Sequence, residues 1–222
     1  MSKKYDTLLF DLDGTLLDTL GDLTDGVNYV LSRFSFNIKT QEEICSYIGN
    51  GIPTLLRRAM PEDCSDEQHS MAIHLFGEYY KNNMKNLTKP YKGITELLRK
   101  LKDSDYKIGV VSNKNDSEVK ELCAYFFRDI FDIKFAFGAT TEETRKPSPR
   151  LIFDAVELFE SDKSHTLFIG DSEVDIQTAK NAEIDIICVG WGFRDSDFLH
   201  INGAKIVAKD ADDLWILLTS LA

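Results

Sequence analysis

A short apolar run near the start of the chain leads directly into two aspartates that are one residue apart. Residues 8–10 are Leu, Leu and Phe, and Asp11, Leu12, Asp13 and Gly14 follow. Alternate residues of a strand share a face, so Asp11 and Asp13 point the same way. Carboxylates are costly at the mouth of a core unless a cation or a reaction requires them. The pattern predicts a buried strand that ends in a nucleophile and a proton-transfer group around a hard metal ion.

Composition restricts the partners and the compartment of the protein. The chain has 222 residues, and its 37 acidic residues exceed its 26 Lys and Arg by 11. This surplus argues against nucleic acid or an anionic membrane as the main partner. Asp11 interrupts the first apolar run, which therefore predicts neither a signal peptide nor a membrane span. The four cysteines are scattered, as is typical of a reduced, cytoplasmic protein.

Helical patterns and strand patterns occupy different parts of the chain. Between residues 19 and 87 we expect helices only, two of them opened by capping boxes at Thr40 with Glu43 and at Ser65 with Gln68. Helices and apolar strands alternate elsewhere, with strands predicted at residues 7–12, 107–112, 134–137, 166–169, 184–189 and 206–207. Such strands indicate a parallel sheet covered on both faces. The expected fold class is therefore α/β: residues 1–18 and 88–222 form the core, and residues 19–87 form an inserted α-helical domain.

Polar residues recur directly after the predicted strands. Ligands of an open parallel sheet bind outside the carboxyl ends of its strands, so these residues are candidates for one site. The set is Asp11 with Asp13, Ser112 with Asn113 and Lys114, Lys146 before Pro147, and Gly170-Asp171 with Asp175. Each group alone is a weak signal, because Ser-Asn after a strand is typical of a turn or a helix cap, Lys-Pro of a loop and Gly-Asp of a turn. Their order along successive strand ends favours a shared catalytic site. Trp191, flanked by glycines after a later strand, is expected at the same edge.

This ordered set resembles the four motifs of the haloacid dehalogenase superfamily of aspartate-based phosphohydrolases. Those motifs are an Asp-x-Asp-Gly-Thr strand end, a Ser or Thr after the second core strand, a Lys, and a Gly-Asp-x-x-x-Asp segment. The resemblance implies a Rossmann-like three-layer core, and it makes residues 19–87 the helical cap domain of that family.

The resemblance also implies a role for each motif residue. Asp11 would be the nucleophile that forms an aspartyl-phosphate, and Asp13 would be the general acid and base. Mg²⁺ would be the cofactor, held by the Asp11 carboxylate, the Asp13 backbone carbonyl and Asp171.

The remaining motif residues are implied to hold the phosphate and to support the metal site. Ser112 and the backbone amide of Asn113 would bind phosphate oxygens, and Lys146 would neutralise the gathering negative charge. Asp175 would act behind the metal ligands by fixing waters or Lys146. Direct metal contact by Asp175 is an open alternative.

The same residues discriminate between reaction classes. Dehalogenases of the superfamily lack the second aspartate, so Asp13 favours phosphoryl chemistry. Phosphomutases with this kind of cap tend to carry a histidine after the first motif, and residues 18–23 contain none. A catalytically silent binding module would be expected to have lost Asp11, Asp13 or Lys146, and all three are present. The expected activity is a phosphatase.

The predicted cap suggests a substrate. Gly49, Asn50 and Arg58 lie in a segment that resembles phosphoglycolate phosphatases, although Asn115 replaces a proline usual in that subgroup. Glycines would let the backbone approach a very small substrate, and Arg57 or, preferably, Arg58 would meet its carboxylate. The expected partner is a small phosphorylated metabolite such as 2-phosphoglycolate. Alternatives are a pyrophosphatase, a nucleotidase or a sugar-phosphate phosphatase of the same superfamily, and the sequence does not predict an oligomeric state.

Overall fold

The computed structural model describes residues 4–220, which form two compact units. The larger unit contains the chain up to Leu17 and from Pro90 onward, and the smaller unit is Asp18–Lys89. The short strands β2 (Leu17–Asp18) and β3 (Lys89–Pro90), where the chain passes between the units, pair with each other. Among the described residues, no helix combines the length and the apolar character needed to cross a bilayer.

The larger unit is built on a parallel sheet of six strands in the order β5-β4-β1-β6-β7-β8. Its strands are β1 (Thr7–Phe10), β4 (Lys107–Asn115), β5 (Ala136–Ala139), β6 (Thr166–Gly170), β7 (Asp185–Val189) and β8 (Val207–Ala208). Every residue of β1 and β6 is buried, because both faces of these strands are covered. Continuous apolar runs of this kind are typical of such sheets, and the predicted parallel sheet is confirmed.

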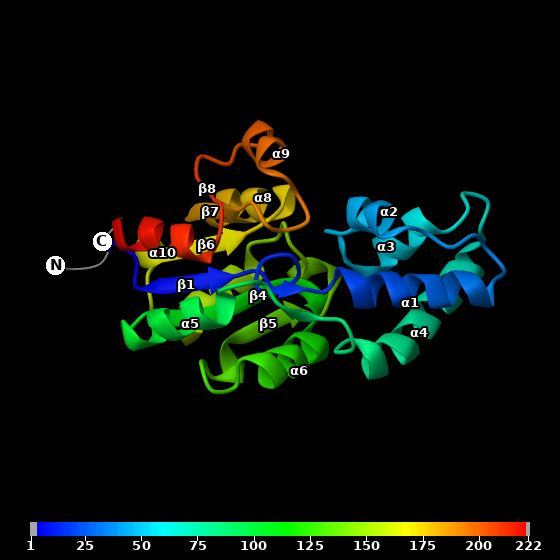
Figure 1. Cartoon of the computed structure of the whole chain (residues 1–222), viewed down its shortest axis with the longest axis horizontal. Coiled ribbons are helices and arrows are strands. Elements are labelled where there is room, and N and C mark those ends of the chain that lie inside the picture. Colours follow the sequence, from blue (N-terminus) through cyan, green and yellow to red (C-terminus); the bar gives the residue numbers. More distant parts are fainter. Residues whose placement is uncertain (1–3, 221–222) are drawn as a thin grey trace. The chain divides into compact units, whose positions relative to one another are not determined.

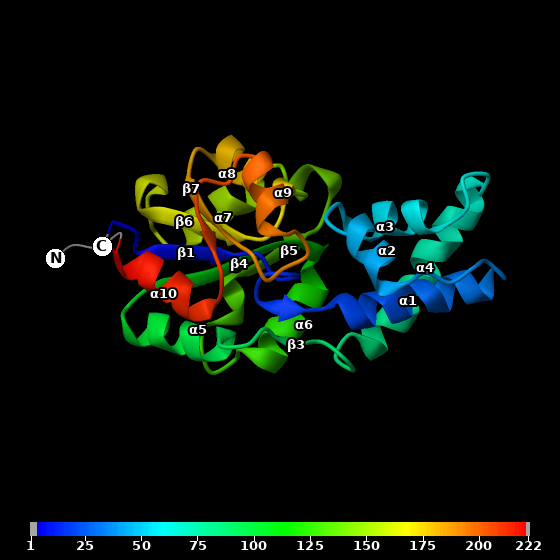
Figure 2. The same cartoon turned by 45° about the horizontal axis from the view of Figure 1, so that its top comes forward.

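Helices form a layer on each face of the sheet (Figures 1 and 2). One layer contains α5 (Ile94–Asp103), α6 (Asp116–Phe126) and α10 (Ala211–Ser220), and the other contains α7 (Arg150–Leu158) and α8 (Glu173–Ala182). The short helix α9 (Ser196–Ile201) packs beside β8. Single 3-10 turns lie at Ile133–Phe135, Glu142–Thr144 and Lys163–His165. The unit therefore has the three-layer α/β architecture predicted from the sequence.

The core between the sheet and the α7–α8 layer determines where the strand-end side chains point. Leu9, Val111 and Phe168 contribute from the sheet, and apolar residues of α7 and α8 pack against them. Each such side chain stabilises the fold by about 1.5–3 kcal/mol when fully buried. Since alternate residues share a face, Asp11 lies on the same side of the sheet as Leu9. The Asp11 side chain therefore emerges on the side of α7 and α8.

The smaller unit consists of α1 (Leu20–Arg33), α2 (Gln41–Tyr47), α3 (Gly51–Ala59) and α4 (Asp66–Asn83). Both predicted capping boxes are confirmed: Thr40 and Glu43 exchange hydrogen bonds before α2, and Ser65 and Gln68 do so before α4. Helix α1 packs on α4, where Gly26 lies so close to the Phe76 ring that a Cβ would stand 2.7 Å from it. This unit is all-helical apart from its short terminal strands.

The segment before β5 and helix α9 differ from the sequence prediction. The extended piece predicted at residues 134–137 begins two residues later, as β5, because Ile133–Phe135 forms a 3-10 turn in which the Asp132 side chain accepts the N–H of Lys134. Helix α9 was not predicted, although Asp195 caps it by accepting the N–H of Phe198 at 2.7 Å.

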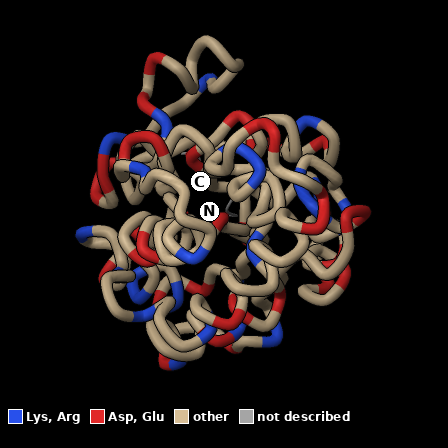
Figure 3. Tube along the Cα trace, turned by 90° about the vertical axis from the view of Figure 1, so that its right-hand side faces the viewer, with Lys and Arg blue, Asp and Glu red and all other residues tan. Residues whose placement is uncertain are grey.

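Acidic and basic residues are interspersed along the trace (Figure 3).

Candidate active site

The register of the central strands brings the predicted site residues to one edge of the sheet. Phe10 of β1 lies beside Val110 of β4 and Ile169 of β6. The N–H of Asp11 continues this ladder by donating to the carbonyl of Ile169 at 2.8 Å. The residues that follow Phe10, Val110 and Ile169 therefore lie side by side at the carboxyl end of β1. They are the segments that begin with Asp11, Val111 and Gly170.

Three buried carboxylates and one buried amine meet at this edge. Asp11, Asp171 and Asp175 each place a carboxylate oxygen within 4.8 Å of the others. The Nζ of Lys146 lies 2.9 Å from Oδ1 of Asp11 and 2.7 Å from Oδ1 of Asp175. Lys146 precedes α7 and Asp175 lies in the first turn of α8, so the two helices of one layer complete the cluster.

The electrostatics of the cluster favour a bound cation. Burial raises the pKa of Asp11 to about 7, against the effect of Lys146 and with the help of Asp175 and Asp13. Burial, Asp175 and Asp11 raise the pKa of Asp171 well above its usual range. Burial lowers the pKa of Lys146, but Asp11 and Asp175 outweigh it and raise this pKa above its ordinary value. One ammonium is thus shared by two of the three carboxylates, and the negative charge that it leaves uncompensated suits a divalent cation.

The donor set also suits Mg²⁺, because hard cations prefer carboxylate and carbonyl oxygens. The two oxygens of Asp175 already have protein partners: Oδ1 accepts from Lys146, and Oδ2 accepts from the N–H of Ser172 at 3.1 Å and from its hydroxyl at 2.6 Å. Both oxygens of Asp171 also accept hydrogen bonds, but from neutral groups, the N–H of Phe193 and the hydroxyl of Thr15. In Asp11, Lys146 contacts Oδ1. Asp11 and Asp171 are therefore better placed than Asp175 to hold a metal ion. Asp175 is best placed to fix Lys146.

Asp13 is placed differently from its neighbour Asp11. Its side chain is 16% exposed, and its Oδ2 lies 3.2 Å from the Nζ of Lys114, which is buried. Its Oδ1 is buried without a hydrogen-bond partner among the described residues. The sequence put Lys114 at this strand end without a role. The sequence signal for this contact was the position of Lys114 directly after Ser112 and Asn113, at the strand end that carries other site residues.

Ser112 and Asn113 have distinct surroundings. Ser112 is buried, and its Oγ accepts the N–H of Lys114 at 3.3 Å. The Asn113 side chain accepts the N–H of Lys146 at 2.6 Å and donates to the carbonyl of Lys146 at 3.1 Å. Asn113 therefore holds the backbone that carries the catalytic lysine candidate. Phosphate binding by the Asn113 backbone amide stays a prediction.

The remaining predicted residues belong to the smaller unit. Arg58 is exposed and donates from Nη1 to the carbonyl of Tyr47 at 2.8 Å. Arg57 is also exposed, and its Nη2 lies 2.8 Å from Oδ1 of Asp66. Asn50 precedes α3 without capping it through its side chain, and Gly49 has a φ of +126°, a conformation that favours glycine. Both arginines therefore face solvent.

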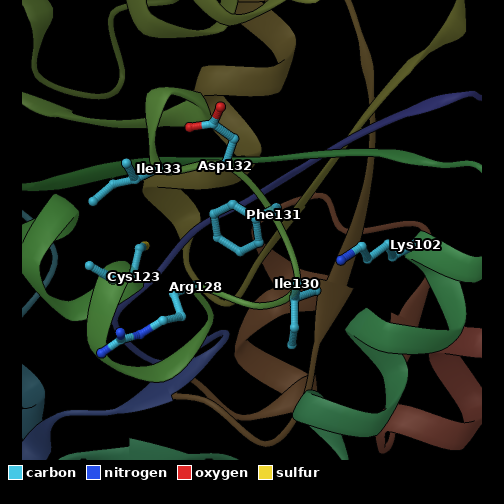
Figure 4. Close-up of a pocket in the computed structure, with 8 residues that line it drawn as sticks. Lys102, Cys123, Arg128, Ile130, Phe131, Asp132 and Ile133 are labelled. Carbon is cyan, nitrogen blue, oxygen red and sulfur yellow. The ribbon is translucent and has the colours of Figure 1, made fainter.

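A separate hollow of about 510 Å³ lies between α5, the end of α6 and the segment before β5 (Figure 4). Ile130, Phe131 and Ile133 make its wall largely apolar, and Lys102 donates to the carbonyl of Asp129 at 2.6 Å. The ends of α5 and α6 lie toward the amino edge of a parallel sheet, because each helix runs back from one strand to the start of the next. The hollow contains none of the predicted site residues.

Comparisons with known proteins agree with this geometry. A family model described as haloacid dehalogenase-like hydrolase matches residues 8–189. A phosphoglycolate phosphatase from Mesorhizobium japonicum is 29% identical over 210 residues, which cover 90% of this chain and 89% of that protein. One from Nitrosospira multiformis is 32% identical over 193 residues, which cover 85% and 84%.

Solved structures show the same relationship. The crystal structure of a candidate phosphoglycolate phosphatase from Lactobacillus delbrueckii superposes with a TM-score of 0.89 at 32% identity, and the match covers 97% of this chain and 98% of that one. The matched family model spans most of the chain, including the strand ends that carry the acidic cluster. This chain therefore belongs to the haloacid dehalogenase-like hydrolase family.

Proposed function

We propose that this protein is a Mg²⁺-dependent phosphatase that hydrolyses a small phosphate monoester, 2-phosphoglycolate, through an aspartyl-phosphate on Asp11. The observation that carries the proposal is the buried cluster of Asp11, Asp171 and Asp175 around Lys146 at the carboxyl edge of the sheet. Ligands of open α/β sheets bind at this edge. A family of hydrolases supplies the reaction class.

Asp11 is the proposed nucleophile. Its Oδ1 accepts the N–H of Leu12 at 2.7 Å and lies 2.9 Å from the Nζ of Lys146, so we assign the attack on phosphorus to Oδ2. The new O–P bond forms as the ester P–O bond breaks, and the leaving alkoxide takes a proton from Asp13. When bound, Mg²⁺ offsets the negative charge of the phosphoryl oxygens. Lys146 offsets the charge of Asp11 through its contact with Oδ1.

Asp13 is the proposed general acid and base. Its unpartnered Oδ1 can carry the proton to the leaving group, while Lys114 holds Oδ2 in place at 3.2 Å. In the second half of the reaction, Asp13 takes a proton from the water that attacks the phosphorus of the aspartyl-phosphate. The P–O bond to Asp11 then breaks, which releases inorganic phosphate and restores both carboxyl groups.

The substrate is proposed from the relatives and from the smaller unit. Two relatives that are 29% and 32% identical to this chain are phosphoglycolate phosphatases. Arg58 is the proposed partner of the substrate carboxylate, since an exposed guanidinium can exchange its bond to the Tyr47 carbonyl for a charged acceptor. Gly49 and Asn50 are proposed to approach the same small substrate.

The proposal is tested with metal-depleted protein and a panel of phosphate esters. Phosphate release from 2-phosphoglycolate, pyrophosphate, a nucleoside monophosphate and a sugar phosphate is measured before and after Mg²⁺ is added. We expect activity only with the metal, and the highest kcat/KM for 2-phosphoglycolate. A higher kcat/KM for pyrophosphate, a nucleotide or a sugar phosphate would reject the substrate. Undiminished hydrolysis after chelation would reject the metal-dependent reaction.

A further inference from the structure

The segment that follows β7 packs directly against the aspartate that follows β6. Both oxygens of the Asp171 carboxylate accept protein hydrogen bonds: Oδ2 accepts the backbone N–H of Phe193 at 2.7 Å, and Oδ1 accepts the hydroxyl of Thr15 at 3.1 Å. Asp171 and Thr15 are fully buried. The direction of this carboxylate is therefore set by one group after β7 and one group after β1.

Trp191 ties these two groups together. Its indole Nε1–H donates to the backbone carbonyl of Thr15 at 3.0 Å. Thr15, which donates to Oδ1 of Asp171, is thus bound by the same segment that donates to Oδ2 through the N–H of Phe193. At the far end of the same segment, the Nε of Arg194 lies 3.2 Å from Oε2 of Glu173 at the start of α8. Residues 190–194 are consequently fastened on both sides of Asp171.

Two glycines make the approach possible. A Cβ on Gly192 would stand 2.4 Å from the Cβ and the Oδ2 of Asp171 and 2.4 Å from the carbonyl of Gly14. A Cβ on Gly14, which has a φ of +87°, would stand 2.3 Å from Oδ2 of Asp171. No side chain fits at either position without displacing the carboxylate. The backbone of the segment is therefore in direct contact with the proposed metal ligand.

We propose that residues 190–194 are a positioning element for Asp171 and that Trp191 anchors this element on Thr15, so that the affinity of the site for a divalent cation depends on the indole N–H. Contacts behind a metal ligand commonly change metal affinity by about 10–100-fold when they are removed. This inference rests on the proposed function only in placing a cation at Asp11 and Asp171. Trp191 is a positioning residue because it acts through Thr15.

The matched variants are Trp191→Phe and Trp215→Phe. The first keeps an aromatic ring and removes the N–H, and the second changes the other tryptophan of the chain, in α10. Mn²⁺ is the probe, and its binding to metal-depleted protein is measured by electron paramagnetic resonance of the free ion. We expect Trp191→Phe to bind Mn²⁺ about 10–100-fold more weakly and Trp215→Phe to match the wild type. If Trp191→Phe binds Mn²⁺ with a dissociation constant within about twofold of the wild-type value, the proposal is overturned.

A purely structural role would give a different result. It would lower the unfolding temperature of metal-depleted Trp191→Phe and leave its Mn²⁺ affinity intact. As a second test, Gly192→Ala is expected to weaken Mn²⁺ binding further, because its Cβ would displace Asp171. If Gly192→Ala does not fold, Trp191→Phe alone decides. Since the readout is binding, a protein that bound Mn²⁺ normally but lacked phosphatase activity would reject the proposed function and leave this inference standing.

Discussion

The larger and the smaller unit use their charged side chains differently. In the larger unit, Lys146 is buried and lies within 2.9 Å of Asp11 and 2.7 Å of Asp175. In the smaller unit, Arg57 and Arg58 are exposed and contact Asp66 and a backbone carbonyl. Burying charge is costly even when it is paired, whereas exposed pairs contribute about 0–1 kcal/mol. The larger unit therefore retains a costly arrangement of the kind that is typical of functional sites.

This difference separates what the protein does from what it acts on. The buried cluster constrains the reaction because each of its side chains has one position and defined hydrogen-bond or ion-pair partners. The exposed arginines constrain the substrate less, because solvent-facing side chains can take several positions at little cost. We therefore expect changes in the larger unit to affect kcat and changes in the smaller unit to affect KM.

The strongest expected effect comes from the buried lysine. Lys146→Met should lower kcat about 10²–10³-fold, because the cation that offsets Asp11 is lost. The matched control is Lys107→Met. Lys107 is the first residue of β4, and its Nζ donates to the carbonyl of Phe159. Steady-state kinetics with saturating Mg²⁺ measure the effect, and circular dichroism checks folding. Equal kcat losses in the two variants would contradict the special position of Lys146.

The arginine pair gives an intermediate effect in the other unit. Arg58→Ala should raise KM for 2-phosphoglycolate about 10–100-fold, which corresponds to the loss of a hydrogen bond between charged groups. Arg57→Ala should leave KM unchanged, because this guanidinium is bound to Asp66. Neither variant should alter KM for a phosphate ester that lacks a carboxylate. A wild-type KM in Arg58→Ala would contradict the proposed contact between Arg58 and the substrate carboxylate.

The pH dependence of stability tests the charge of the cluster without substrate. Burial raises the pKa of Asp11 to about 7, whereas an unfolded aspartate has a pKa of about 3.9. The stability contributed by the neutral carboxyl is therefore fully present below the unfolded pKa and is lost as the pH rises through the folded one. Metal-depleted protein should become less stable between about pH 4 and 7. Asp11→Asn should show a shallower fall.

Mg²⁺ should act against this loss. Its stabilising effect in thermal unfolding should be larger at about pH 8 than at about pH 5, because metal binding needs ionised carboxylates. Asp171 shifts in the same direction as Asp11 and adds to the effect. A stability that rises with pH across this window in the metal-depleted protein would contradict the assigned charge state.

Two capping boxes provide the smallest and most closely matched effect. Thr40→Ala and Ser172→Ala should each cost about 1 kcal/mol of stability, because each removes the acceptor for a helix N–H. Only Ser172 also donates to Oδ2 of Asp175, so Ser172→Ala should additionally lower kcat by about 10-fold. Thermal unfolding and kinetics on the two variants measure both quantities. A kcat loss in Thr40→Ala, or none in Ser172→Ala, would break the comparison.

The polar residues that follow the strands could be predicted from the sequence because their signals are local. An apolar strand followed by Asp11 and Asp13, and another followed by Asp171, can each be recognised within a few residues. The parallel sheet followed from the alternation of strands with helices. Register then placed the strand ends side by side, as expected for neighbouring parallel strands.

Other features depend on contacts between distant parts of the chain. Trp191 binds a carbonyl 176 residues away, and Lys114 meets Asp13 only after two strands have paired. Strand β1 ends at Phe10, two residues earlier than predicted, because the Leu12 carbonyl accepts the N–H groups of three residues in the following turn. Tertiary contacts, which no local pattern encodes, set these features.

Phosphorylation of Asp11 is the most direct test of the account. The Mg²⁺-loaded enzyme is mixed with 2-phosphoglycolate, quenched in acid within the first turnover, and digested for peptide mass spectrometry. We predict one added phosphoryl group on the peptide that contains Asp11, and none in Asp11→Asn, which should lose about 10⁴-fold or more in kcat. Wild-type phosphate release by Asp11→Asn, or a phosphoryl group on a different residue, would contradict the account.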